Sequence, residues 1–395
     1  MNPPSEKRRL DELDSLRGLA ALSVVLGHFL HTLPPSPPEG SLLFNTLRVF
    51  KGTPLFLTVA GHEAVILFFL LSGFVLCLPW LNANRIAYTP YVVRRVFRIY
   101  VPYLAAVLFT FLCATLLYSG ALPAFGEWVN RPWSIRATWK SFADHVLLVG
   151  SFKNAQFNPV IWSLVHEMRI SLVFPFVVLI LRTANWRYCC AAAVALSCVG
   201  VIANKLTADH TDYFYTLHYL GFFIVGFLLA RHRHDLGKLY ACCGRRAQIP
   251  FWAGAIGAYT YGHLMNFIVL QDWVIGIGAG IFILLAQHDP YCRRVLGWGV
   301  SRFLGKISYS LYLFHAVLLL AVLHVFKGWL PLWAMFIVAG LLIALVSSLS
   351  WRFVERTSIA CGKMLSQRIE NARAKRSTKQ CDTSLSIAPS HTGNL

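Results

Sequence analysis

Apolar and polar positions fall in long blocks along most of the chain. Nearly unbroken apolar stretches, such as Val65–Leu78 and Met335–Leu349, are separated by short polar segments. A bilayer core of about 30 Å requires a helix of about 20 mainly apolar residues, so blocks of this length are typical of membrane-spanning helices. The pattern predicts an all-α, polytopic integral membrane protein.

Ten transmembrane helices are expected from these blocks. They are predicted at residues 16–33, 62–82, 98–119, 160–181, 188–204, 213–231, 249–265, 269–287, 307–326 and 333–354. The Ala-rich span at 188–204 and the span at 249–265 carry the weakest signal. The short apolar stretch His145–Phe152 is expected to form an interfacial or re-entrant helix. The first block is followed by a proline-rich loop instead of a small-residue cleavage site, so we expect an uncleaved first span.

The basic residues predict how these spans are oriented. With the N-terminus inside, 27 of the 36 Lys and Arg residues lie in inner segments, 8 lie in outer loops, and Arg169 lies within a span. Because Lys and Arg accumulate in cytoplasmic loops, both termini are expected in the cytoplasm. The predicted organisation is a cytoplasmic segment at 1–15, a membrane domain at 16–358 and a basic, disordered cytoplasmic tail at 359–395. The protein is expected to be a multi-pass protein of the inner (plasma) membrane.

Composition supports this picture and argues against other classes. Charged residues make up 13% of the chain, whereas a soluble domain carries about 25%. The net charge of +19 is accounted for by basic inner loops in contact with membrane lipid, so no nucleic-acid partner is expected. None of the ten cysteines falls in a predicted outer loop, and neither CxxC nor a zinc-ligand spacing occurs. We therefore expect neither structural disulfides nor a bound metal.

Ionisable residues inside the predicted spans are the first candidates for function, because burying them in lipid is costly. They are His28, His166, Glu167, Arg169 and His315. His28 and Glu167 each lie about 8–10 Å below the outer membrane boundary at 1.5 Å per residue. An imidazole beside a buried carboxylate is a usual arrangement for a general base. The same two residues would also serve as a structural polar clamp between helices.

A second group of candidates lies at the inner ends of the spans. Arg17 precedes His28 by eleven residues, so the two share a helix face about 16 Å apart. The other basic residues at this level are Arg94, Arg95, Arg98 and Lys306. Guanidinium groups bind phosphate through paired hydrogen bonds, so the cluster suits a phosphate-bearing ligand. Anionic lipid head groups would suit it equally well.

Several motifs, taken in order along the chain, resemble those of the membrane acyltransferase-3 family, which O-acetylates glycans and other acceptors. The resemblance rests on Arg17-x10-His28, Leu70-Leu71-Ser72-Gly73-Phe74, the Arg-x-x-Arg segment Arg95–Arg98, Trp162-Ser163-Leu164-Val165-His166-Glu167, Gly305–His315 and Glu355. It covers about residues 10–358. The sequence departs from the family pattern at His166, which places a second imidazole beside Glu167 and leaves two histidines as candidate bases.

The resemblance implies a donor, an acceptor and roles for the residues. The donor is expected to be acyl-CoA, usually acetyl-CoA, and the acceptor a hydroxyl of a cell-surface glycan or glycolipid such as lipopolysaccharide. His28 would act as base or acyl carrier, with Glu167 orienting or stabilising its imidazole. Residues expected to hold the donor phosphates are Arg17, Arg94, Arg95, Arg98 and Lys306. Residues expected to shape the pocket are Ser72, Trp162, Ser163, His166, Tyr309 and His315.

Two other functional classes fit part of the pattern. A multi-span secondary transporter would also carry buried ionisable residues, but transporters are often built from internal repeats, and Arg17-x10-His28 has no counterpart in the second half. A lipid- or glycan-binding membrane protein without catalysis would leave the motifs unexplained. For the acceptor, the outer loop Gly120–Pro159 is a candidate, because its aromatic side chains suit stacking on sugars. These are Trp128, Trp133, Trp139 and Phe157.

Overall fold

The computed structural model describes residues 6–33, 39–81, 87–133, 137–150, 157–207 and 212–386, and these contain helices but no strand. The prediction of an all-α protein is thereby confirmed. The first half contains α1 (Glu6–His31), α2 (Leu42–Gly52), α3 (Gly61–Cys77), α4 (Tyr88–Arg95), α5 (Val101–Leu117), α6 (Glu127–Asn130), α7 (Trp139–Val146), α8 (Ile161–Leu181) and α9 (Trp186–Leu206). The second half contains α10 (Tyr213–Arg231), α11 (Arg233–Cys242), α12 (Arg245–Tyr261), α13 (Ile268–His288), α14 (Pro290–Leu296), α15 (Gly299–Phe326), α16 (Leu332–Ser350) and α17 (Arg356–Ser386).

Nine helical runs among the described residues are long and apolar enough to cross a membrane. They are Asp11–His31, Gly61–Trp80, Tyr88–Leu117, Ile161–Leu181, Trp186–Leu206, Tyr213–Arg231, Ile268–His288, Gly299–Phe326 and Leu332–Arg373. Each overlaps a predicted span, so the chain is a multi-pass membrane protein. The tenth predicted span, 249–265, falls on α12, whose 17 residues reach only about 25 Å, the lower limit for a crossing.

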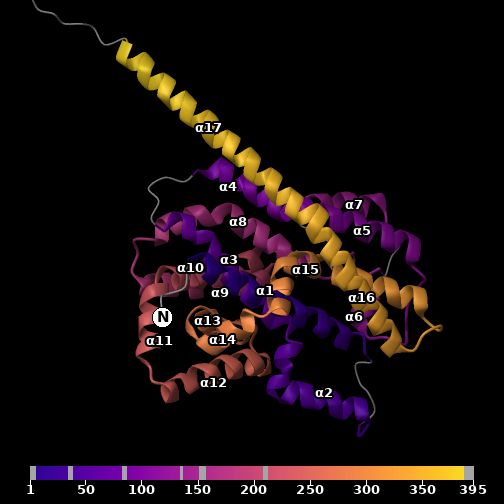
Figure 1. The fold of residues 1–395 in the computed structure, drawn as a ribbon. Coiled ribbons are helices and arrows are strands. Elements are labelled where there is room, and N and C mark those ends of the chain that lie inside the picture. The colour runs from indigo at the N-terminus through magenta and orange to yellow at the C-terminus, as the bar shows by residue number, and fades with distance from the viewer. Residues whose placement is uncertain are drawn as a thin grey trace, which may run out of the picture.

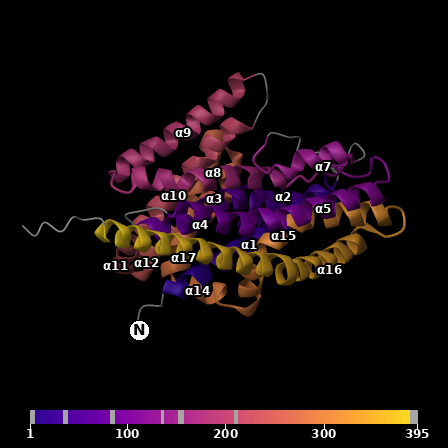
Figure 2. The same cartoon turned by 90° about the horizontal axis from the view of Figure 1, so that it is seen from above.

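Helix α1 runs through the middle of the bundle, where it packs along α15 and against α3 (Figure 1). Helix α10 lies against the other side of α3 and carries α9 at one edge of the molecule (Figure 2). Helices α16 and α17 lie at the opposite edge (Figure 2). The two helices that carry His28 and His315 are therefore direct neighbours at the centre of the fold.

A contact between two glycines allows α1 and α15 to approach so closely. A methyl group added at Gly18 would lie 2.3 Å from the backbone nitrogen of Gly305, and one added at Gly305 would lie 2.7 Å from the carbonyl oxygen of Asp14. Real Cβ atoms do not approach other atoms this closely, so glycine at both positions permits the packing. Arg17 and Lys306 are the chain neighbours of these glycines, which places both cations at the same level.

The region 98–119, predicted as one span, belongs to a longer helical run. Its helix begins at Tyr88 and continues through a π-helical turn, Val96–Tyr100, into α5. Arg94, Arg95 and Arg98 therefore lie within the run and not at its opening. Of the predicted interfacial helix His145–Phe152, the first residues end α7, whereas residues 151–156 lie outside the described part of the chain.

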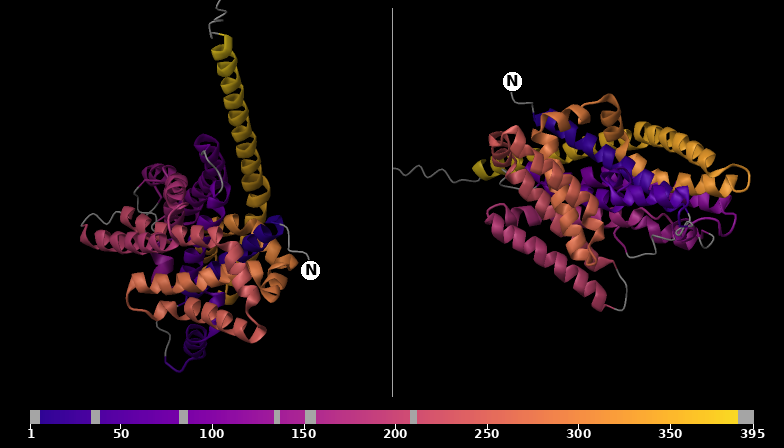
Figure 3. Two further views of the ribbon diagram at one scale, coloured as in Figure 1. Left: turned by 90° about the vertical axis from the view of Figure 1, so that its left-hand side faces the viewer. Right: turned by 90° about the horizontal axis from the view of Figure 1, so that it is seen from below.

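The tail that was predicted to be disordered from residue 359 is helical in the structure as far as residue 386. After a π-helical turn, Trp351–Glu355, the last span continues directly into α17, which extends past α4 and away from the bundle (Figures 1 and 3). Arg94 of α4 forms an ion pair with Glu370 at 3.1 Å, and Arg373 donates to the hydroxyl of Thr89 at 2.7 Å. Backbone continuity and these contacts favour a helix that composition alone did not indicate.

A buried polar network ties together α3, α9, α10 and α13. The side chain of Asp272 is fully buried, with one carboxylate oxygen 2.7 Å from Nε2 of His62 and the other 3.0 Å from Nε2 of His218. The second ring nitrogen of His218 lies 2.7 Å from the hydroxyl of Ser197. Since Asp272 and His218 are fully buried, each depends on its protein partners for hydrogen bonds, whereas the side chain of His62 is 35% exposed.

Removing the carboxylate from this network is expected to destabilise the fold strongly. Asp272→Leu leaves the buried imidazole of His218 and the partly exposed imidazole of His62 without their acceptor, and breaking a buried pair such as Asp272–His218 costs about 3–5 kcal/mol. We expect a lower thermal midpoint and less monodisperse protein in detergent. The exposed Asp144→Asn change is the control and is expected to leave both measurements unaltered. Equal thermal midpoints for Asp272→Leu and the unaltered protein would contradict a stabilising role for this polar network.

Candidate active site

A cavity of about 560 Å³ opens among α1, α3, α4, α8 and α15. It is called the basic cavity below, because all five basic residues predicted to hold a phosphate-bearing donor contribute to its wall. They are Arg17, Arg94, Arg95, Arg98 and Lys306. Three of the predicted pocket residues also line it, namely Ser72, Ser163 and Tyr309. The deeper wall is apolar and aromatic, with Val65, Phe68 and Phe69 from α3.

The five cations of the basic cavity are not equally available to a ligand. Arg17 lies 3.3 Å from Asp14, and Arg95 donates to Glu167 at 3.2 Å. Arg94 is engaged by α17, as described above. The remaining two, Arg98 and Lys306, are exposed and make no hydrogen bond or ion pair within the described part of the chain. These two side chains are therefore the best placed to bind an incoming anion.

The similar depths of His28 and Glu167 suggested that the two residues pair. In the structure they do not, because Glu167 lies in the wall of the basic cavity. One of its carboxylate oxygens accepts hydrogen bonds from the hydroxyl of Ser72 at 3.1 Å and from Arg95 at 3.2 Å. Arg95 in turn donates to the hydroxyl of Ser171 at 2.7 Å. Equal depth did not produce contact because α8, which carries Glu167, packs against α3 and α10, whereas α1 packs against α15. Glu167 holds an arginine of the cavity in place.

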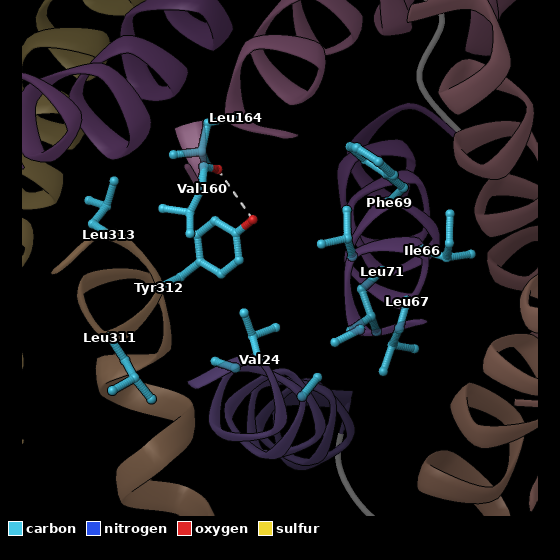
Figure 4. Close-up of a cluster of buried hydrophobic side chains, with 14 of the residues drawn as sticks. Val24, Ile66, Leu67, Phe69, Leu71, Val160, Leu164, Leu311, Tyr312 and Leu313 are labelled. Atoms are coloured by element: carbon cyan, nitrogen blue, oxygen red, sulfur yellow. Dashed lines mark hydrogen bonds between the residues drawn. The ribbon is translucent and has the colours of Figure 1, made fainter. Parts of the chain in front are cut away.

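The deep end of the basic cavity is lined by Tyr312, which the sequence motifs alone did not single out. Its ring lies among side chains of α1, α3 and α8 (Figure 4). Its hydroxyl lies 2.7 Å from that of Ser163 and donates to the carbonyl oxygen of Val160 at 3.3 Å. Tyr312 lies one helical turn before His315 in the same motif, and that spacing is the signal that could have identified it.

Next to Tyr312 lie two histidines, His28 and His315, which are called the histidine pair below. Nδ1 of His28 lies 2.8 Å from Nε2 of His315, and the two rings are within 13° of parallel. The ring of Tyr312 lies 5.8 Å from that of His315. The indole of Trp128, from α6, stacks on His28 with centroids 4.6 Å apart. The histidine pair thus lies between the end of the basic cavity and the loop that carries Trp128.

His166 and Trp162 do not line the basic cavity, although the sequence placed both in the pocket. Nδ1 of His166 lies 2.9 Å from the hydroxyl of Thr216 on α10. Both side chains pack against Tyr219, with ring centroids 5.0 Å and 5.8 Å away. His166 therefore serves the contact between α8 and α10, which leaves the histidine pair as the imidazoles nearest the end of the cavity.

The aromatic residues of the outer loop differ in their burial and in the residues that they contact. Trp133 is buried and donates from its indole nitrogen to the carbonyl oxygen of Phe157 at 3.2 Å, so it packs the loop. Trp139 is 74% exposed. Beside Phe157, burial lowers the pKa of His145, so this imidazole stays neutral at neutral pH. Of the predicted sugar-stacking residues, Trp128 alone touches the histidine pair among the described contacts.

Comparisons with known proteins point to one class. Residues 10–352 match a family model described as an acyltransferase domain. A curated relative, acyltransferase MdmB of Streptomyces mycarofaciens, is 31% identical over 217 residues, which cover 52% of this chain and 50% of the relative. The match thus spans about half the length of that relative. No solved structure matches the chain.

Proposed function

Since the chain belongs to the acyltransferase-domain family and is a membrane-embedded enzyme of that class, we propose that it is an O-acyltransferase with acyl-CoA as donor. The acyl group, acetyl in the simplest case, passes to a hydroxyl of a glycan or related acceptor. One observation carries the proposal: a basic cavity large enough for a phosphate-bearing ligand ends within ring contact of the histidine pair.

The donor fits the distribution of charge in the basic cavity. Arg98 and Lys306 offer unengaged cations to the nucleotide phosphates, and a guanidinium binds phosphate through two parallel hydrogen bonds. The apolar wall from Val65 to Phe69 suits the uncharged arm that carries the thioester. To bring the thioester from the level of Arg17 to that of His28, this arm has to span about 16 Å along the axis of α1. Tyr312 lies between the cavity and the histidine pair, so its side chain has to move for the thioester to reach the two histidines.

The expected orientation places donor and acceptor on opposite sides. Because 27 of the 36 Lys and Arg residues fall in segments that the ten-span prediction puts on the side of the N-terminus, we assign that side to the cytoplasm of a cell with the protein in its inner membrane. The basic cavity then takes acyl-CoA from the cytoplasm. His28 and Trp128 lie in the outer half, where a glycan or glycolipid hydroxyl arrives.

Two routes of transfer use the same imidazole. In the first, His28 removes the proton of the acceptor hydroxyl while its oxygen attacks the thioester carbonyl; the carbon–sulfur bond breaks, and the imidazolium returns the proton to the thiolate. In the second, His28 itself attacks the carbonyl and releases the thiolate. The acceptor oxygen then displaces the imidazole from the acyl group, and the proton of the acceptor hydroxyl passes to the released thiolate.

The proposal is tested with the purified full-length protein in lipid vesicles, radiolabelled acetyl-CoA and a glycolipid extract. Transfer of label to a component of the extract supports it, and the labelled product identifies the acceptor. Failure to bind or consume acetyl-CoA, in the presence of intact glycans, contradicts it and directs attention to uptake assays for a transporter.

The free cations of the basic cavity are expected to govern the KM for acetyl-CoA. Arg98→Ala and Lys306→Ala each remove a charged hydrogen bond worth about 1.5–3 kcal/mol, so KM is expected to rise about 10- to 100-fold with kcat nearly unchanged. Acetyl-pantetheine lacks the nucleotide phosphates and is expected to respond equally in all variants. Arg246→Ala, an exposed cation outside the cavity, is the matched control. An unchanged KM for acetyl-CoA in both cavity variants would exclude this phosphate site.

A further inference from the structure

The hydrogen-bond partners of His315 determine which of its ring nitrogens carries a proton. Its Nδ1 lies 3.0 Å from the carbonyl oxygen of Leu311, one turn earlier on α15. A carbonyl oxygen only accepts hydrogen bonds, so Nδ1 must carry the hydrogen. His315 is fully buried and has no carboxylate among its described partners, and a lone buried charge is costly. The ring is therefore neutral, and its Nε2 carries a lone pair.

This arrangement determines the proton position on His28 in turn. Nδ1 of His28 lies 2.8 Å from Nε2 of His315, and because Nε2 of His315 is an acceptor, Nδ1 of His28 must be the donor. A neutral imidazole has one N–H, so Nε2 of His28 carries the free lone pair. Within the described part of the chain, that nitrogen has no hydrogen-bond partner.

We propose that His315 is the positioning residue of the reaction, holding His28 in the tautomer whose Nε2 takes the acceptor's proton or the acyl group. The inference rests on the proposed function and deepens it, because it replaces the expected carboxylate by a second imidazole. A chain of hydrogen bonds runs from the carbonyl of Leu311 through His315 to His28. Glu167, engaged with Ser72 and Arg95, takes no part in it.

The same contact stabilises the charge that appears during transfer. When Nε2 of His28 gains a proton or an acyl group, the ring becomes cationic, and its hydrogen bond from Nδ1 to His315 becomes charge-assisted and stronger. The indole of Trp128, stacked on the His28 ring, supports the cation through its electron-rich face. His315 is neutral and not anionic, so it helps less than a carboxylate would, but it is far less costly to bury in the membrane.

The kinetic test compares two side chains that differ in their ability to accept this hydrogen bond. In His315→Gln the amide oxygen can accept from Nδ1 of His28, whereas His315→Met fills similar space without an acceptor. We expect kcat to fall about 10²- to 10³-fold in the Met variant and by less than about 10-fold in the Gln variant, since orienting groups around a working histidine contribute on this scale. The KM for acetyl-CoA is expected to stay within about twofold, because His315 does not line the basic cavity. Equal kcat losses in the two variants, at equal thermal midpoints, would overturn the assignment, as would a Met variant with unaltered kcat.

A spectroscopic test reads the tautomer without any acyl transfer. In full-length protein labelled with ¹⁵N-histidine, subtracting the spectrum of His28→Asn isolates one of the 14 histidines. The inference requires a protonated Nδ1 and an unprotonated Nε2 for His28, and a shift toward the Nε2–H form in His315→Met. Protonation at Nε2 in the unaltered protein overturns it. If the expected tautomer is found but acetyl-CoA is not consumed, the proposed function fails while the role of His315 in positioning His28 stands.

Discussion

Alanine at position 28 is expected to lower kcat for acyl transfer by about 10³-fold, the largest loss that a single side chain should cause in this protein. The change removes the nitrogen that takes the acceptor's proton, and proton transfer by a positioned side chain contributes about 10²–10⁴-fold. The KM for acetyl-CoA should stay nearly constant, because His28 does not line the basic cavity. Initial rates with labelled acetyl-CoA and the acceptor extract provide the measurement.

The control for this variant is His31→Ala, one turn further along α1. The ring of His31 lies 6.2 Å from that of His28 and is exposed, so its loss is expected to change kcat by less than about threefold. More than a tenth of normal turnover in His28→Ala, with donor binding intact, would exclude His28 from the chemistry and would leave Tyr312 and Ser163 as the groups nearest the end of the basic cavity.

The same variant separates the two routes of transfer. When acetyl-CoA is supplied without acceptor, an acyl-imidazole route leaves label on the protein, and His28→Ala abolishes that label. A general-base route leaves no label on either protein. Rapid acid quenching followed by measurement of protein-bound label distinguishes the two, because both routes share Nε2 of His28 but only one forms a bond to it.

The sequence predicted the helices, and the gathering of the basic residues in one place, for a physical reason. Block length is set by the thickness of the bilayer, so the spans are visible without knowledge of their neighbours. Arg17 and Lys306 lie in the N-terminal halves of α1 and α15. The depth of a residue along a span can be counted from its sequence position at 1.5 Å per residue. Arg17 and Lys306 were therefore correctly grouped before the fold was known.

Contacts between spans could not be predicted in the same way. Depth gives the height of a residue in the membrane but not the neighbour that its helix faces, so His28 was matched to Glu167, at a similar depth, and not to His315. The sequence feature that marks the correct neighbour is the pair Gly18 and Gly305, one beside Arg17 and the other beside Lys306. A glycine in a span marks close helix packing in membranes, but one sequence does not tell which two glycines meet.

Widening the contact between α1 and α15 is expected to disable the enzyme from a distance. In Gly305→Val the new Cβ atom would lie 2.7 Å from the carbonyl oxygen of Asp14 and 2.9 Å from the backbone nitrogen of Ser15. Backbone atoms cannot rotate away as a flexible side chain does, so the two helices must separate. Overpacking of this kind costs about 1–3 kcal/mol or more, and the histidine pair, ten residues further along α15, depends on the same spacing.

We expect kcat of Gly305→Val to fall by at least about 10²-fold, because a displacement of about 1 Å at a reacting group can cost that much, together with a lower thermal midpoint. Gly340→Val on α16 is the matched control, since nothing lies within 4 Å of its added Cβ. Gly305→Ala should give an intermediate loss, because alanine meets the same backbone with a smaller side chain. If Gly305→Val kept normal turnover, the spacing of α1 and α15 could not be what holds His28 against His315. Turnover lost at an unchanged thermal midpoint, in contrast, would tie the glycine contact to the geometry of the histidine pair and not to folding.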